Sequence, residues 1–137
     1  MPGRLMPVRF LQPPGWPLPQ GYANGVVASG QSVFVGGQIG WNAQGVFADG
    51  LAAQVGQALQ NIADVLAVGG AAPDRIVRLT WFVVDVDDYV AQRRAIGRAY
   101  RAVLGKHYPA MSVIGVSRLV EKQALVEIEA TAVLDSE

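Results

Sequence analysis

The sequence predicts an α+β fold in which two helices cover one face of a sheet of about six strands. Residues 124–134 (ALVEIEATAVL) alternate strictly between two faces, as a strand does. Residues 50–68 carry apolar side chains at helical spacing. The expected order is three strands, a helix, a strand, a helix and two strands. Two helices of this length can cover only one sheet face, so the other face needs a partner.

The first part of the chain is expected to form strands around a proline-rich loop. Residues 5–11 are predicted to form the first strand, and residues 13–21 form a loop that is neither helix nor central strand. Two short apolar runs, residues 25–28 and 32–35, are separated by Ser29-Gly30-Gln31, which predicts a hairpin. The glycines of residues 36–40 end the second run, and no phosphate-loop spacing follows them.

The remaining elements follow from caps and periodicity. Asp49 is expected to cap the helix of residues 50–68, and Gly69-Gly70 ends it. Residues 75–85 are rich in β-formers and predict a strand. Asp87 or Asp88 is expected to cap a second helix that runs to about residue 104. Residues 111–116 and 125–134 are the last two strands. The helix stripe consists of Leu51, Val55, Leu59, Ile62 and Leu66.

The composition excludes several classes of protein. The 137 residues are 51% hydrophobic and only 16% charged, which favours an oligomer that covers apolar surface. The net charge is zero, so the chain carries no electrostatic footprint for nucleic acid or an anionic membrane. It has no cysteine and one histidine, which argues against thiol chemistry and a zinc site. Without a membrane-length apolar run or a signal-peptide pattern, we expect a cytoplasmic protein of one domain, residues 1–137.

The last strand contains the clearest candidate for chemistry. Glu127 and Glu129 share one face with Leu125, Thr131 and Val133. Carboxylates on so apolar a strand need partners. Glu127 is interpreted either as a general base that positions water or as a structural carboxylate at a subunit interface. Glu129 is interpreted as structural.

Six motifs, in this order and spacing, make the chain similar to the RidA (YjgF/L-PSP endoribonuclease-like) family over residues 12–134. They are Gly21-Tyr22, residues 33–39 (VFVGGQI), residues 54–62 (QVGQALQNI), residues 74–80 (DRIVRLT), Tyr108-Pro109-Ala110 and residues 126–130 (VEIEA). The resemblance implies a chorismate-mutase-like fold and a homotrimer with a barrel-like centre. It also implies ligand clefts between subunits, and hydrolysis of reactive enamines and imines without a metal or organic cofactor.

The same resemblance implies roles for particular residues. Glu127 matches the glutamate that positions the attacking water, and Tyr22 matches a tyrosine that closes the pocket from a neighbouring subunit. Backbone groups near Gly36, Gly37 and Ser112 would stabilise developing charge.

The chain departs from the family pattern where the carboxylate of the substrate is bound. Met111 follows Pro-Ala in place of an arginine, and methionine cannot pair with a carboxylate. Gly36 stands where a small polar residue is common. Arg93 falls nearest the family's helix contact and is a candidate replacement. The sequence therefore leaves open a deaminase-like hydrolase with a non-standard substrate, a non-catalytic ligand-binding or regulatory trimer, and an endoribonuclease.

Overall fold

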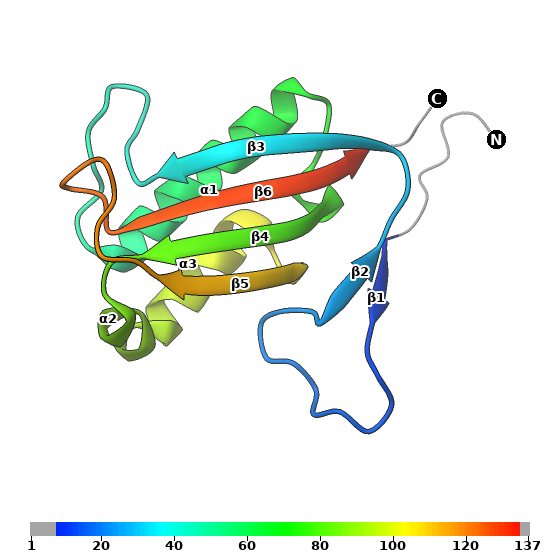
Figure 1. The fold of residues 1–137 in the computed structure, drawn as a ribbon. Coiled ribbons are helices and arrows are strands. Elements are labelled where there is room, and N and C mark those ends of the chain that lie inside the picture. Colours follow the sequence, from blue (N-terminus) through cyan, green and yellow to red (C-terminus); the bar gives the residue numbers. More distant parts are fainter. Residues whose placement is uncertain (1–7, 135–137) are drawn as a thin grey trace.

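The computed structural model describes residues 8–134. Its elements follow the expected order of strands and helices, an α+β arrangement (Figure 1). They are β1 (Arg9–Leu11), β2 (Gly25–Val27), β3 (Gln31–Ile39), α1 (Leu51–Val68), the short 3-10 helix Pro73–Arg75, β4 (Ile76–Val83), α2 (Val86–Ala91), α3 (Arg93–Leu104), β5 (Ala110–Gly115) and β6 (Val126–Leu134).

The strands form two sheets, so the prediction of one six-stranded sheet is wrong. Strands β3, β6, β4 and β5 form a four-stranded sheet in that order, and β1 pairs with β2 alone. Strand β5 runs parallel to β4, whereas β6 is antiparallel to both of its neighbours. The loop before β2 lies against the edge strand β5, because the Ala23 N–H donates to the Pro109 carbonyl, just before β5, at 3.0 Å.

The predicted hairpin around Gly30 is also wrong. Strand β2 pairs with β1 and β3 pairs with β6, so the chain passes from one sheet to the other at this turn. Gly30 has a φ of 135°, and a Cβ there would lie 1.7 Å from the Leu134 carbonyl oxygen. The glycine is therefore needed for close approach to β6. Of the expected first strand, residues 5–7 lie outside the described residues.

The helices begin at other residues than expected. The N-cap residue of α1 is Gly50 and not Asp49. Gly50 has a φ of 88°, and no side chain caps the helix. The second helix is two helices, because Gln92 departs from helical dihedral angles between α2 and α3. Asp85 caps α2 by accepting from the Asp88 N–H at 3.0 Å, so Asp87 and Asp88 are not the cap.

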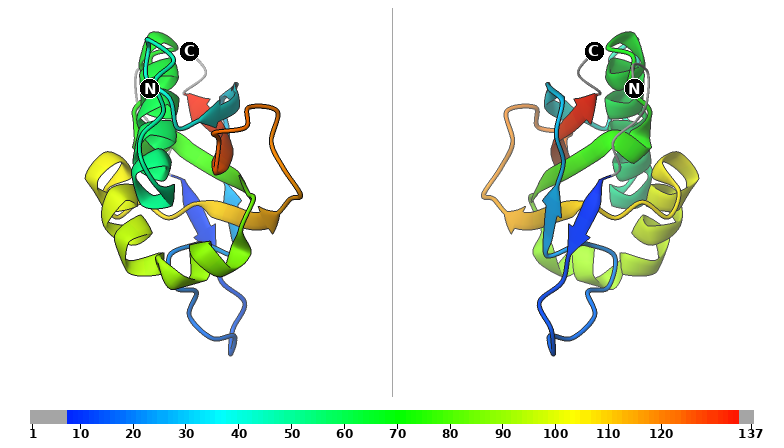
Figure 2. Two further views of the ribbon diagram at one scale, coloured as in Figure 1. Left: turned by 90° about the vertical axis from the view of Figure 1, so that its left-hand side faces the viewer. Right: turned by 90° about the vertical axis from the view of Figure 1, so that its right-hand side faces the viewer.

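The core lies between the four-stranded sheet and helices α1 and α3. Alternate residues of β6 and β4 meet the α1 stripe, which is buried as predicted. Figure 2 shows the helices on one side of the sheet. No helix within residues 8–134 covers the opposite side, here called the open face. The open face carries exposed side chains such as Phe34, which is 77% exposed.

Candidate functional site

The chain forms a cleft between helix α3 and the edge strand β5, here called the edge cleft. Its volume is about 550 Å³, within the range of small-molecule sites. Met111 faces this side of the sheet because it pairs with Leu79, which in turn pairs with the buried Ala130. The lining of the edge cleft includes Trp81, Tyr89, Arg93, Tyr100, Tyr108 and Met111.

Aromatic rings form one wall of the edge cleft. The rings of Tyr100 and Tyr108 stack with centroids 5.3 Å apart, and Trp81 stacks on Tyr100 at 6.3 Å. The Tyr100 hydroxyl donates to the His107 carbonyl at 2.5 Å. Burial, and to a lesser degree the nearby Tyr108, raise the pKa of Tyr100 well above its ordinary value. The Tyr100 hydroxyl is therefore neutral at physiological pH.

Arg93 supplies positive charge at the rim of the edge cleft. Burial raises the pKa of Tyr89, and the Arg93 charge partly opposes that rise. The guanidinium therefore lies close enough to act on the Tyr89 hydroxyl. Arg93 itself is exposed, and its Nε makes only a long bond of 3.4 Å to the Val90 carbonyl. It remains available to a ligand.

Glu127 lies on the other side of the sheet. It pairs with Phe82 of β4 and is half-buried. Its side chain rests against the backbone of Gly37, where a Cβ would lie 2.6 Å from the Glu127 carboxyl carbon. The structure thus brings together two of the predicted site residues, and the missing side chain of Gly37 is what leaves room for the carboxylate.

Other predicted residues line or adjoin the open face. Gly36 lines a hollow of about 270 Å³ that also includes Arg78, Thr80 and Glu129. Ser112 is exposed on β5 and pairs with Thr80. These backbone and hydroxyl groups lie on the same face as Glu127.

Tyr22 lies in a third hollow, beside the edge cleft. This hollow, of about 290 Å³, shares Pro19 and Tyr108 with the edge cleft. Tyr22 is 41% exposed there, next to the point where Ala23 bonds the Pro109 carbonyl. A ring with this exposure is free to cover a ligand that enters from solvent.

Apart from Tyr22, the predicted site residues therefore fall into two groups on opposite faces of the sheet. Met111 and Arg93 line the edge cleft, whereas Glu127, Gly36, Gly37 and Ser112 belong to the open face. Strand β4 lies between the strands of Met111 and Glu127. One chain alone does not bring Met111 and Glu127 into a common pocket.

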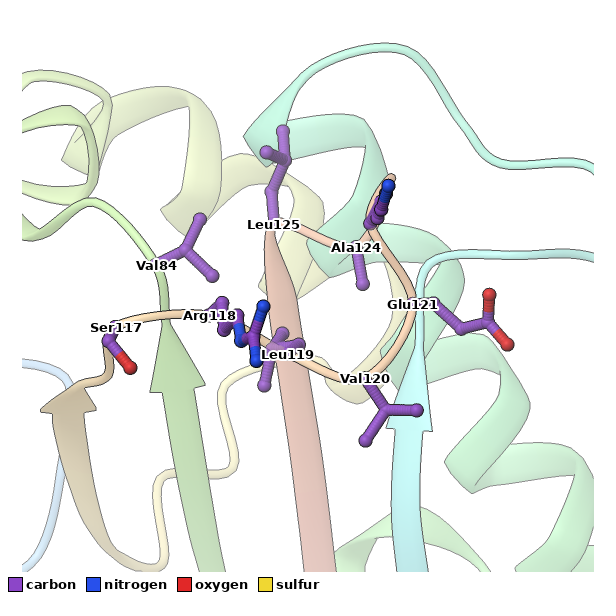
Figure 3. A pocket seen from close by; sticks show the side chains of 9 residues that line it. Val84, Ser117, Arg118, Leu119, Val120, Glu121, Ala124 and Leu125 are labelled. Atoms are coloured by element: carbon purple, nitrogen blue, oxygen red, sulfur yellow. The ribbon is translucent and has the colours of Figure 1, made fainter.

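A further hollow lies at the loop between β5 and β6. The loop between β5 and β6 curls around about 650 Å³ and brings Ser117, Arg118 and Glu121 to its lining (Figure 3). Glu121 points away from Arg118 in this view. Its lining includes none of the predicted site residues, and Val120 at its rim is fully exposed. We therefore place the candidate site at the edge cleft and the open face.

No cluster of three or more metal-ligating side chains occurs within residues 8–134. Nor does this part of the chain contain a helix long and apolar enough to cross a membrane.

Sequence reasoning missed several residues of the edge cleft. Gly97 and Arg101 line it beside Arg93, and Trp81 forms part of its floor. The sequence could have indicated Gly97 and Arg101, because residues 93, 97 and 101 are spaced by four and share one helix face. Trp81 is 2% exposed, and its indole N–H finds no acceptor among the described residues.

Comparison with known proteins identifies the family. A family model described as endoribonuclease L-PSP matches residues 17–134. A RutC family protein of Synechocystis is 31% identical over 94% of this chain and 98% of its own length. The 2-iminobutanoate/2-iminopropanoate deaminase of Salmonella typhimurium is 34% identical over 76% of this chain and 80% of its own.

Solved structures agree. The Rid-family protein YyfB of Yersinia pestis, described as of unknown function, superposes with a TM-score of 0.82 at 36% identity, over 94% of this chain and all of that one. The YjgF gene product of E. coli gives a TM-score of 0.67 at 33% identity, over 82% and 87% of the two chains. The chain therefore belongs to the endoribonuclease L-PSP family, and the predicted RidA membership is confirmed.

Proposed function

We propose that this protein is a homotrimeric hydrolase that converts reactive imines or enamines to carbonyl compounds and ammonia at sites shared between subunits. The separation of Met111 and Glu127 on opposite faces of the sheet carries the proposal. A second copy that covers the open face would bring a Glu127 to the edge cleft of its neighbour. The 77% exposed Phe34 on that face supports such a contact.

The chemistry needs a positioned water. In the proposed reaction, Glu127 holds a water molecule and takes its proton as the oxygen attacks the imine carbon. The electrons of the C=N bond pass to the nitrogen, which takes up a proton. The carbinolamine then loses its hydroxyl proton and its nitrogen gains one; the C=O bond forms as the C–N bond breaks, and ammonia leaves. Backbone groups near Gly37 would stabilise the developing charge. Relatives named 2-iminobutanoate/2-iminopropanoate deaminase support this reaction class.

Met111 indicates a substrate different from the imine of alanine. A guanidinium at this position would bind a carboxylate through two bonds, and a thioether binds none. Losing such a contact in a buried site costs several kcal/mol of affinity, on the order of 2–5. We therefore expect a substrate that is more apolar than the imine of alanine. Trp81, Tyr100 and Tyr108 around Met111 fit an apolar substrate body.

Ammonia release from 2-iminopropionate, generated in situ by an amino-acid oxidase, tests this account. The wild-type protein is expected to hydrolyse it slowly. Met111→Arg should raise kcat/KM by about tenfold or more, since it restores the carboxylate contact. Met111→Leu, an apolar swap of similar volume, should match the wild type. A wild-type rate already equal to that of Met111→Arg would contradict the role given to Met111.

A non-catalytic ligand-binding trimer is the second candidate. It is favoured by the same methionine together with Gly36, whose position offers no polar side chain to a ligand. In that case the wild type and Glu127→Ala would bind a ligand equally well, and neither would release ammonia from any imine. Ribonuclease action, which the family description suggests, has less support because the chain has zero net charge and a single histidine.

A further inference from the structure

Helix α3 carries a glycine between two arginines on the face that borders the edge cleft. Arg93, Gly97 and Arg101 follow one another at intervals of four and line both the edge cleft and an adjoining hollow with Arg94 and Arg98. A Cβ on Gly97 would lie 3.1 Å from Nη1 of Arg101. The Arg101 guanidinium therefore lies against the helix where a side chain is missing. Glycine within a helix costs stability relative to alanine, so its position here calls for a reason.

The arginines of this helix have no anionic partners within the described chain. None of the four forms an ion pair with a described carboxylate. Two carboxylates at the adjoining α2 are engaged elsewhere: Asp85 caps the helix, and Asp88 accepts from the Gln92 amide at 2.6 Å. Four like charges within three turns repel one another, and a bound anion would relieve that repulsion. Paired guanidinium groups suit a planar carboxylate.

The interior behind these arginines is aromatic. Tyr108 and Tyr100 stack nearly parallel at 12°, and Met111 lies beside them in the lining. Methionine packs well against aromatic edges. A flat apolar group can rest against this wall, because Tyr108 is only half-buried. The edge cleft thus combines a positive rim with a flat, apolar interior.

We propose that the edge cleft binds an aromatic 2-imino or 2-oxo carboxylate, its ring against Tyr108 and Met111 and its carboxylate between Arg93 and Arg101 over Gly97. This names the substrate class of the proposed hydrolase and rests on that proposal for the reaction at the C=N bond. It also gives the carboxylate a partner on the helix side of the cleft in place of the arginine that Met111 replaces.

Calorimetric binding of phenylpyruvate, a stable 2-oxo acid, tests the ligand class. Phenylpyruvate should bind at least about tenfold more tightly than pyruvate, which lacks the ring, and than phenylacetamide, which lacks the charge. Arg101→Gln should weaken phenylpyruvate binding about fivefold or more. Arg98→Gln removes a charge from the adjoining hollow but not from the edge cleft, and it should change the affinity by less than about twofold.

Gly97→Ala separates a binding role from a structural one. The added methyl group keeps every charge but shifts the Arg101 guanidinium by a few tenths of an ångström from its place against the helix. It should weaken phenylpyruvate binding about fivefold while raising the melting temperature, because alanine favours the helix. Equal affinities for phenylpyruvate and pyruvate would overturn the proposal, as would unchanged binding by both Gly97→Ala and Arg101→Gln.

The outcomes also separate the ligand class from the proposed reaction. Phenylpyruvate binding by wild type and Glu127→Gln, without ammonia release from any imine, would support the ligand class and contradict the hydrolase. Ammonia release from an imine, together with equal affinities for aromatic and non-aromatic 2-oxo acids, would contradict the proposed ligand class. The proposed hydrolase activity would be unaffected by that result.

Discussion

The carboxyl carbon of Glu127 lies where a side chain on Gly37 would have to begin, 2.6 Å from the Cβ position of that residue. Gly37→Ala should therefore push the Glu127 carboxylate out of place. We expect it to abolish ammonia release and to cost about 1–3 kcal/mol of unfolding free energy, as overpacking does. Steady-state kinetics and urea unfolding measure both effects.

The neighbouring glycine provides the stability control. A Cβ on Gly36 meets no atom within 4 Å, so Gly36→Ala should change the unfolding free energy by less than about 0.5 kcal/mol. Equal stability and equal activity of Gly37→Ala and the wild type would show that the contact with Glu127 has no consequence.

The exposed apolar side chain of Phe34 on the open face is expected to be covered by a second subunit. Phe34→Lys places a charge there and should convert the proposed trimer to monomers, because burying an unpaired charge is costly. Light scattering after size-exclusion chromatography measures the mass. Val68→Lys is the matched control, since Val68 is 92% exposed at the end of α1. Trimers of the Phe34 variant would rule out the open face as the interface.

Gln54 holds two loops to helix α1. Its amide donates to the carbonyls of Ala48 and Gln123 at 3.2 and 3.0 Å, and its carbonyl accepts from the Leu125 N–H at 2.8 Å. Gln54→Ala should cost about 1–3 kcal/mol in urea unfolding, because it leaves three part-buried backbone groups without their partner. Gln60→Ala on the same helix removes only an exposed contact with Asp64 and should cost less than about 0.5 kcal/mol. Similar losses from both variants would contradict this account.

The stability of the protein should fall above about pH 10. The pKa of Tyr100 is raised above its ordinary value of 10.0, chiefly by burial. Between the unfolded and folded pKa values the folded state holds more protons, so the unfolding free energy falls as pH rises, by at most about 1.4 kcal/mol per unit for this group. Burial raises the pKa of Tyr89 in the same direction.

The Tyr100→Phe variant isolates this contribution. It should be less stable at pH 7 by about 1 kcal/mol, through loss of the bond to the His107 carbonyl, and show a shallower decline above pH 10. An unchanged slope in Tyr100→Phe would contradict the assignment.

Local patterns predicted the element order, the α1 stripe and the faces of β6, because periodicity reports burial directly. Local patterns did not predict which strands pair with one another. The sequence around Gly30 reads as a hairpin, yet the glycine lets the chain cross between sheets beside Leu134. Gln54 looks like a surface residue in a polar run, and only the loops that fold over it explain its burial.

The candidate site was predictable in part for the same reason. The contact between Gly37 and Glu127 joins residues ninety positions apart, and the family resemblance supplied both. The aromatic wall behind Met111 depends on how α3 lies over β4 and β5, which no local pattern specifies.

The mixing of two inactive variants tests most directly whether the site is shared between subunits. Glu127→Ala removes the proposed water-positioning group on the open face, and Arg93→Glu reverses the charge at the edge cleft. Each variant alone should release no ammonia from an imine that the wild type hydrolyses. Refolded together, they should regain activity, because some interfaces then join an intact edge cleft to an intact Glu127. Mixed trimers with no more activity than the separate variants would contradict the account.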